Sequence, residues 1–230
     1  MLKAFVKRIV ARLPQASQQE LKRHHFRREI ERGTFRADEP EWALADRWLA
    51  PGDWAIDVGA NVGQYTKRFS DLVGPSGRVV AFEPVSATFE LLSANAARFA
   101  NANVTLLNLA ASDATRLASM NIPRFDTGLV NYYQAAISAE ATEFEIMTCS
   151  IDSLALPHRV RVLKIDAEGH DAVVLNGARS LLARDHPTVI IESVSLEVVA
   201  LMEGLGYGGQ RLPGSSNMLY VAEPTTRPGA

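Results

Sequence analysis

Four acidic side chains occupy the carboxyl ends of predicted β-strands, namely Asp57, Glu83, Asp166 and Glu192. Open α/β sheets bind their ligands at the edge where parallel strands end. A carboxylate at that edge can accept hydrogen bonds from ligand hydroxyl groups, or it can take up a proton during a reaction. We therefore expect the functional site along this edge.

A glycine-containing turn follows the first of these strands, in the segment Asp57-Val-Gly59-Ala-Asn61-Val-Gly63. A helix follows the turn, and the first N–H groups of this helix are free to bind a ligand. A dinucleotide fingerprint requires glycine at the first, third and sixth positions, but the chain has Gly59, Asn61 and Gln64 there. The spacing therefore argues against a nicotinamide dinucleotide as the ligand. It resembles instead motif I of the class I S-adenosylmethionine-dependent methyltransferases.

The second strand, over residues 78–82, ends at Glu83, which lies 20 residues beyond Gly63. An acid at this position of a Rossmann-like unit can accept hydrogen bonds from both hydroxyls of a ribose. Ser112 and Asp113 follow the third strand and are candidates for the adenine side of the ligand. The alternative left open is that these two residues only cap or turn the chain.

Strands and helices alternate along the chain, which predicts parallel pairing with right-handed crossovers. The last two strands, over 207–211 and 218–222, are predicted to be antiparallel. The expected fold class is α/β, a Rossmann-like three-layer sandwich with a mostly parallel seven-stranded sheet, a small β insertion and an N-terminal helical arm. The insertion is expected over residues 114–150, with extended pieces at 117–122, 128–133 and 143–149, and it should help to form the substrate pocket.

The N-terminal residues differ in charge from the remainder of the chain. Residues 1–36 carry ten Lys or Arg against three Glu, a net charge of +7, which leaves −9 for the rest of a chain whose total is −2. We expect a basic helical arm over 1–37, a catalytic domain over 38–222 and a flexible tail over 223–230. Residues 1–13 predict an amphipathic helix that either lies on an anionic membrane or packs on its own domain or a second subunit.

Composition indicates the cellular compartment in which the protein works. Cys149 is the only cysteine, which excludes an internal disulfide and a zinc site built from several cysteines. The first residues are interrupted by lysines and arginines and lack the apolar segment of a secretory signal, and no run is long enough to span a bilayer. We expect a cytoplasmic protein, with peripheral membrane contact and homo-oligomerisation left open.

The segment Lys164-Ile-Asp166-Ala-Glu168-Gly169 carries a resemblance to a known family. Together with the motif I turn, the Phe82-Glu83-Pro84 strand end, and residues 150–154 and 174–178, it resembles the FkbM family of S-adenosylmethionine-dependent methyltransferases over residues 38–222. The resemblance implies S-adenosylmethionine as cofactor. It also implies O-methylation of a hydroxyl on a sugar, glycolipid or polyketide-type natural product, with no nucleic-acid partner.

Binding roles follow from position in this fold. Glu83 is expected to bind the ribose of the cofactor, and Ser112 with Asp113 its adenine. The methionine part is expected along motif I, at Asp57, Gly59, Asn61 and Gly63.

Methyl transfer to a hydroxyl needs a group that removes its proton, because the pKa of an alcohol lies far above 7. Asp166 is the predicted base, with His170 as alternative or helper and Glu168 as an orienting residue. A Mg²⁺ ion on Asp166, Glu168 and Glu192 is an alternative that we do not favour, and no metal ligand is assigned. Two other functions stay open: a cofactor-binding protein that docks on a membrane or partner with little catalysis, and an NAD-type oxidoreductase.

Overall fold

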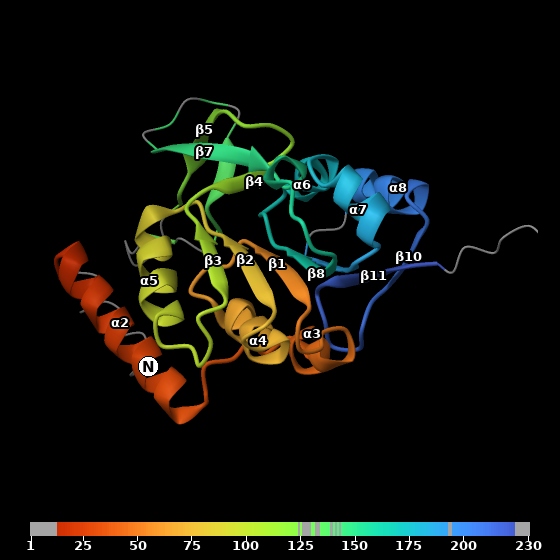
Figure 1. Ribbon diagram of the computed structural model, residues 1–230. Helices are drawn as coiled ribbons and strands as arrows, with labels where there is room; N and C mark the ends of the chain where they lie inside the picture. Colours follow the sequence, from red (N-terminus) through yellow and green to blue (C-terminus); the bar gives the residue numbers. More distant parts are fainter. Residues whose placement is uncertain are drawn as a thin grey trace, which may run out of the picture.

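A seven-stranded sheet forms the centre of the protein (Figure 1). The computed structural model describes residues 13–123, 125, 130, 131, 134–138, 140, 142, 144–192 and 195–223. The strands follow the order β10-β11-β9-β8-β1-β2-β3, in which only β11 runs against the others. Their bounds are β1 Trp54–Val58, β2 Arg78–Phe82, β3 Val104–Leu107, β8 Val160–Ile165, β9 Thr188–Ile191, β10 Tyr207–Gln210 and β11 Met218–Ala222. The predicted fold class is confirmed.

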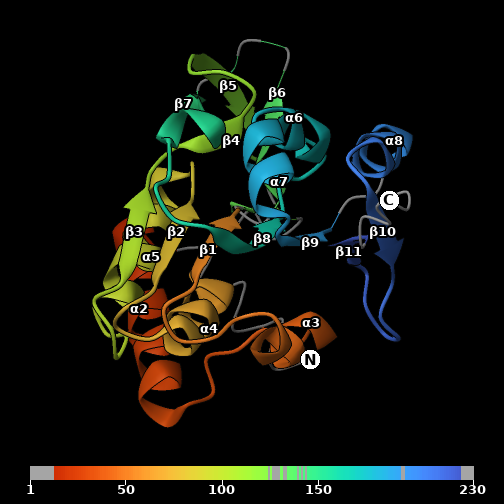
Figure 2. The same ribbon diagram turned by 45° about the vertical axis from the view of Figure 1, so that its right-hand side comes forward.

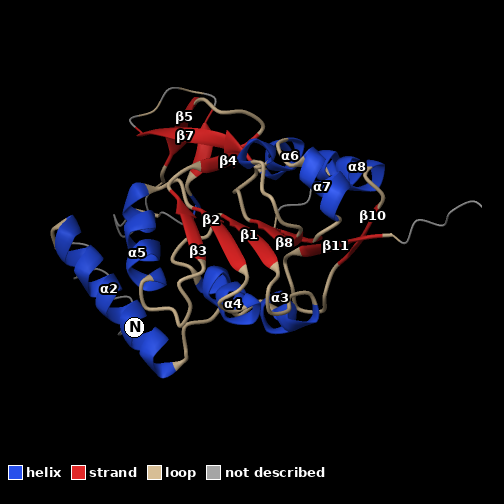
Figure 3. Cartoon of the chain, in the orientation of Figure 1, coloured by secondary structure: helices blue, strands red, loops and turns tan. Residues whose placement is uncertain are grey.

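Helices cover both faces of this sheet, as Figure 3 shows. One face packs on α3 (Pro40–Leu44), the 3₁₀ helix η1 (Ala45–Arg47) and α4 (Gln64–Val73). The other packs on α6 (Asp171–Asn176), α7 (Arg179–Asp185) and α8 (Leu196–Gly204). Buried apolar residues therefore alternate between two cores along each central strand: Ala55 faces the first core, and Ile56 and Val58 face the second.

Residues 41–49 and 171–183, which the sequence predicts as one helix each, are divided into shorter helices in the structure. The helix predicted over 41–49 is divided into α3 and η1. The helix predicted over 171–183 is interrupted at Gly177, where any side chain would overlap the backbone of Ser112. Since α6 ends at this contact, the close approach of two backbones decides where the helix stops.

The β insertion forms a separate four-stranded sheet that lies above the main sheet in Figure 1. Its order is β4-β7-β5-β6, with bounds β4 Ala110–Ser112, β5 Leu117–Asn121, β6 Ala136–Ser138 and β7 Phe144–Ser150, and the 3₁₀ helix η3 (Asp152–Leu154) follows. The extended pieces predicted at 117–122 and 143–149 are confirmed. Much of the piece predicted at 128–133 lies outside the described residues, and the described strand of this region is β6 instead.

The arm continues as a long helix that packs on the domain. Figure 2 shows α2 (Gln15–Arg32) beside α5 (Ser86–Ala96). Phe26 is buried against Phe35 and Phe99, and Arg23 forms an ion pair with Glu90 at 3.2 Å. The amphipathic helix predicted at the start of the chain and most of the predicted tail lie outside the described residues. Among the described helices, none is long and apolar enough to span a bilayer.

Candidate functional site

A cavity opens at the carboxyl edge of the sheet, between β1 and β8. The strand order reverses here, because β1 pairs with β2 on one side and with β8 on the other. The cavity encloses about 610 Å³ of space, which includes open solvent at its mouth. Its lining comes from both sheets: Val58, Gly59, Asn61, Phe82, Glu83, Pro84, Val85, Ala110, Ala111, Met120, Ala135, Ile137, Asp166, Ala167, Glu168 and His170.

The motif I turn joins the tips of β1 and β8. Gly59 has a φ of +71°, and a methyl group at this position would overlap the backbone oxygen of Asp166. The N–H of Asp166 in turn donates to the carbonyl of Val58 at 3.1 Å. Glycine is thus required by contact within the protein. As a consequence, Gly59 and Asn61 line the same cavity as Asp166, Ala167 and Glu168.

Glu83 is held in place by the same turn. Its carboxylate is only 6% exposed, and its two oxygens accept the N–H groups of Asn61 at 2.9 Å and Val85 at 3.0 Å. Burial raises the pKa of Glu83 to about 7, although the two backbone hydrogen bonds act in the opposite direction. The side chain predicted to bind a ribose therefore lies in the cavity wall with a fixed orientation.

Two predicted methionine contacts, Asp57 and Gly63, lie outside the cavity lining. Asp57 is fully buried, and one of its oxygens accepts the hydroxyl of Thr66 at 2.6 Å, while the other has no hydrogen-bond partner in the described part of the chain. Burial raises the pKa of Asp57, with the charge of Lys164 opposing it. Gly63 packs beneath Leu92 of α5. Gly59 and Asn61 are the members of the motif that line the cavity.

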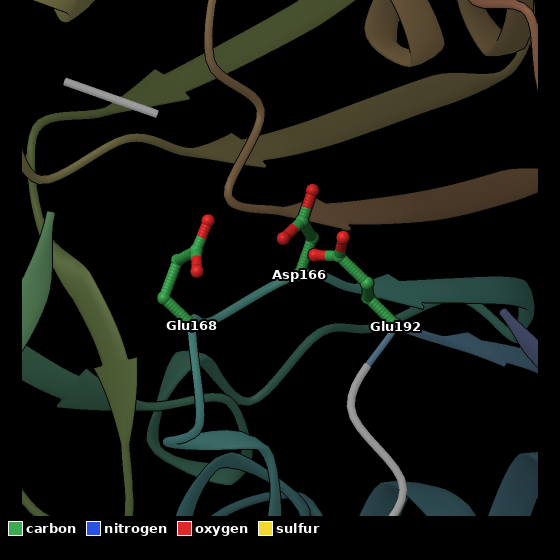
Figure 4. Close-up of side chains that lie close together, drawn as sticks. All are labelled: Asp166, Glu168 and Glu192. Atoms are coloured by element: carbon green, nitrogen blue, oxygen red, sulfur yellow. The ribbon is translucent and has the colours of Figure 1, made fainter. Parts of the chain in front are cut away.

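Three carboxyl groups gather on the floor, from Asp166, Glu168 and Glu192, with one oxygen of each within 4.8 Å of the others. In Figure 4 the carboxyl groups of Asp166 and Glu192 turn toward one another, with Glu168 on the far side of Asp166. Lys164, which is 6% exposed, donates to Asp166 at 3.2 Å. The charge of Lys164 therefore partly balances the negative charge of this group of acids.

A hydrogen bond joins the carboxyl groups of Asp166 and Glu192. Their hydrogen bond, followed by burial, raises the pKa of Glu192 to about 8. Burial favours the neutral form of Asp166, but the charge of Lys164 and the hydrogen bond from Glu192 outweigh it and lower the pKa of Asp166. Near neutral pH, Glu192 therefore donates a hydrogen bond to the Asp166 carboxylate.

Glu168 has an unusual backbone for a non-glycine residue, with a φ of +48°. Such a conformation costs on the order of 1–3 kcal/mol and is concentrated at functional sites. It places Glu168 in the cavity lining, next to Asp166. Burial, then the charges of Asp166 and Asp171, raise the pKa of Glu168.

His170 enters the cavity from the start of α6. Its Nε2 atom lies 3.0 Å from the hydroxyl of Ser112, which donates to Asp113 at 3.2 Å. Burial lowers the pKa of His170, with the charge of Asp113 acting against this shift. Ser112 and Asp113 themselves lie outside the lining, where Ala110 and Ala111 occupy the predicted adenine side.

The roof residues Met120, Ala135 and Ile137 were not singled out from the sequence. The period-two pattern of the insertion predicted its strands, and it is the only signal that pointed to this part of the cavity. Which face of those strands turns toward the main sheet depends on pairing between distant segments. The identity of the roof residues therefore required the structure.

The sheet order, the glycine turn and the acid after β2 together define a Rossmann-like nucleotide-binding class of protein. The model of the methyltransferase FkbM domain matches residues 57–207. The chain belongs to this family, and the family prediction is confirmed.

Two proteins of known name are similar to parts of the chain. A 50-residue segment is 48% identical to the 31-O-demethyl-FK506 methyltransferase FkbM of Streptomyces tacrolimicus, and this match covers 22% of the present chain and 19% of that enzyme. The FkbM methyltransferase structure from Methylobacillus flagellatus KT has a TM-score of 0.56 and 18% identity, over 75% of this chain and 44% of that one. The matches thus span less than half of either relative.

The fold is also similar to that of fibrillarin from Aeropyrum pernix, whose structure contains bound S-adenosyl-L-methionine. The TM-score is 0.51 at 17% identity, and the similarity covers 79% of this chain and 73% of fibrillarin. At this identity, the comparison concerns the fold alone.

Proposed function

We propose that this chain transfers a methyl group from S-adenosylmethionine to a hydroxyl oxygen of a small-molecule acceptor. Its membership of the FkbM methyltransferase domain family supports the reaction class. The observation that carries the proposal is the cavity between β1 and β8, with the buried carboxylate of Glu83 in one wall and the acid cluster of Asp166 on the floor.

The lining fits the proposed donor. Each oxygen of the Glu83 carboxylate accepts one backbone N–H and retains a lone pair for one of the two adjacent hydroxyls of a ribose. Phe82, Ala110 and Ala111 provide an apolar wall for the adenine ring of the donor. Gly59 and Asn61 remain beside the amino-acid end of the donor. When bound, S-adenosylmethionine would supply a methyl group on a positively charged sulfur.

The acids on the floor would act on the acceptor. In the transfer, the bond from acceptor oxygen to methyl carbon forms as the bond from that carbon to sulfur breaks, and the hydroxyl proton passes to a protein base. We assign this base to the Asp166 carboxylate, which Lys164 and Glu192 keep ionised. His170, neutral at pH 7 and exposed to the same cavity, is the second candidate.

Calorimetric titration of donor binding tests the proposal. Wild-type protein should bind S-adenosylmethionine, and Glu83→Gln should weaken that binding about 10- to 100-fold, because hydrogen bonds to a charged group are lost. Glu90→Gln is the matched control, since Glu90 is an exposed acid that pairs with Arg23 on α2. Tighter binding of NADH than of S-adenosylmethionine would support the oxidoreductase alternative and overturn the assignment.

A further inference from the structure

An apolar row crosses the cavity face of the insertion sheet, over strands β6, β5 and β7. Met120 on β5 lies directly opposite Ile137 on β6 and directly opposite Phe144 on β7. Residues that lie opposite one another in neighbouring strands point to the same face of a sheet. Met120 and Ile137 line the cavity, so Phe144 lies on the same face of the sheet, at the β7 end of this row.

Phe144 is exposed although Met120, directly opposite it, is covered. It is 49% exposed, whereas Met120 is 3% exposed. A large aromatic ring gains free energy when an apolar group covers it. The row therefore continues the cavity outward as an apolar surface that a ligand larger than the cavity would cover.

The opposite side of the cavity is acidic. Asp166, Glu168 and Glu83 line it, and Glu192 adds its carboxyl group to the cluster. Among the described lining residues there is no lysine or arginine, and the nearby Lys164 is buried and engaged with Asp166. A phosphate or carboxylate on the acceptor would meet repulsion and find no cationic partner.

We propose that the acceptor is a neutral alcohol with an apolar face beside its hydroxyl group, and that Phe144 is a specificity-determining residue which covers this face. The inference rests on the proposed function, because it assigns the acid floor to the hydroxyl. The hydroxyl faces Asp166, and the carbon skeleton packs on Ile137, Met120 and Phe144. Sugar phosphates, nucleotide sugars and nucleic acids are excluded as acceptors.

Three probes test this assignment on protein saturated with S-adenosylhomocysteine, the product of the donor. Octyl β-D-glucoside, below its micelle concentration, carries neutral hydroxyls and an apolar chain. D-glucose lacks the chain, and octyl phosphate replaces the sugar with an anion. We expect calorimetry to show binding of octyl glucoside at least tenfold tighter than of either other probe. Equal or tighter binding of octyl phosphate would overturn the proposal.

The register of the insertion sheet supplies a matched pair of variants. Phe144→Ser should weaken the binding of octyl glucoside about tenfold. Phe144→Leu should retain most of the affinity for octyl glucoside. Met147→Ser is the control, because Met147 lies on the same strand, is 41% exposed, and pairs with Leu117 on the opposite face. The same loss in Phe144→Ser and Met147→Ser would contradict the assignment.

Binding of S-adenosylhomocysteine separates the two proposals. All three variants should bind it as the wild type does, because Phe144 and Met147 lie outside the donor wall formed by Glu83 and Phe82. A wild-type protein that binds S-adenosylhomocysteine but not octyl glucoside overturns only the acceptor assignment. A wild-type protein that binds no S-adenosylhomocysteine overturns the proposed function itself.

Discussion

Asp166 and His170 reach the same cavity but have different partners. Asp166 is hydrogen-bonded to Lys164 and Glu192, which stabilise its charged form. His170 is hydrogen-bonded to Ser112, and burial lowers its pKa and so favours its neutral form. Asp166 is therefore ionised, and able to accept a proton, throughout the neutral pH range. Asp166 contributes a permanent negative charge beside the reacting hydroxyl, and His170 a neutral nitrogen.

Replacing each residue by asparagine distinguishes the two candidates. Asp166→Asn should lower kcat about 100-fold or more, since positioned bases contribute factors of this order, while the Kd for S-adenosylmethionine changes little. His170→Asn should have the smaller effect. Single-turnover methyl transfer measures both, with Asp71→Asn as a control, because Asp71 is an exposed acid that pairs with Lys67 on α4. A larger loss in His170→Asn would assign the base to the imidazole.

At the scale of elements, the arm helix α2 belongs to the packed structure. Phe26 is 9% exposed and meets Phe35 edge to face at a centroid distance of 5.8 Å, while Gln19 donates to the carbonyl of Ala87 on α5 at 3.2 Å. Most of its other side chains are polar and exposed or half-buried. Phe26 is therefore the one buried side chain of this helix, and Ile30 packs against the same cluster.

Removing that side chain tests the docking of α2. Phe26→Ala should lower the free energy of unfolding by about 3 kcal/mol, since truncating a buried phenylalanine loses burial and leaves a cavity. Leu21→Ala, on the same helix but 49% exposed, should change it by less than about 0.5 kcal/mol. Urea denaturation measures both. Equal small losses would mean that α2 is not docked in solution.

At the scale of the whole molecule, acids with raised pKa values make stability depend on pH. Glu83 titrates at about 7 in the folded chain against an ordinary 4.5, and Glu192 at about 8. Between the ordinary and the raised value, the folded state binds more protons than the unfolded state. The free energy of unfolding therefore falls as pH rises through this range.

We expect the ligand-free protein to be less stable at pH 8 than at pH 5. The stabilisation from neutral Glu83 is complete below pH 4.5 and is lost by about pH 7, at a slope of up to about 1.4 kcal/mol per pH unit. Glu83→Gln removes this titration and should flatten the dependence. Urea unfolding at fixed ionic strength measures the free energy of unfolding at each pH. Wild-type and Glu83→Gln proteins whose free energies change in parallel with pH would refute the raised pKa of Glu83.

The sequence by itself determined the sheet, the strand-end acids and the family. These features depend on short-range patterns: the apolar run before Asp57, the glycines of the turn, and the acids that end each strand. Gly59 and Glu83 could be assigned to one edge because parallel strands place their carboxyl ends together. The same logic brought Asp166, Glu168 and Glu192 into one group.

Only the tertiary structure decided which side chains face the cavity. Asp57 lies behind it, and Ala110 and Ala111 occupy the side predicted for Ser112 and Asp113, because β4 leaves the main sheet to pair with β7. The roof row that ends at Phe144 likewise depends on the register of β5, β6 and β7. Such pairing joins residues far apart in the chain, and a shift of one residue would turn every side chain to the opposite face.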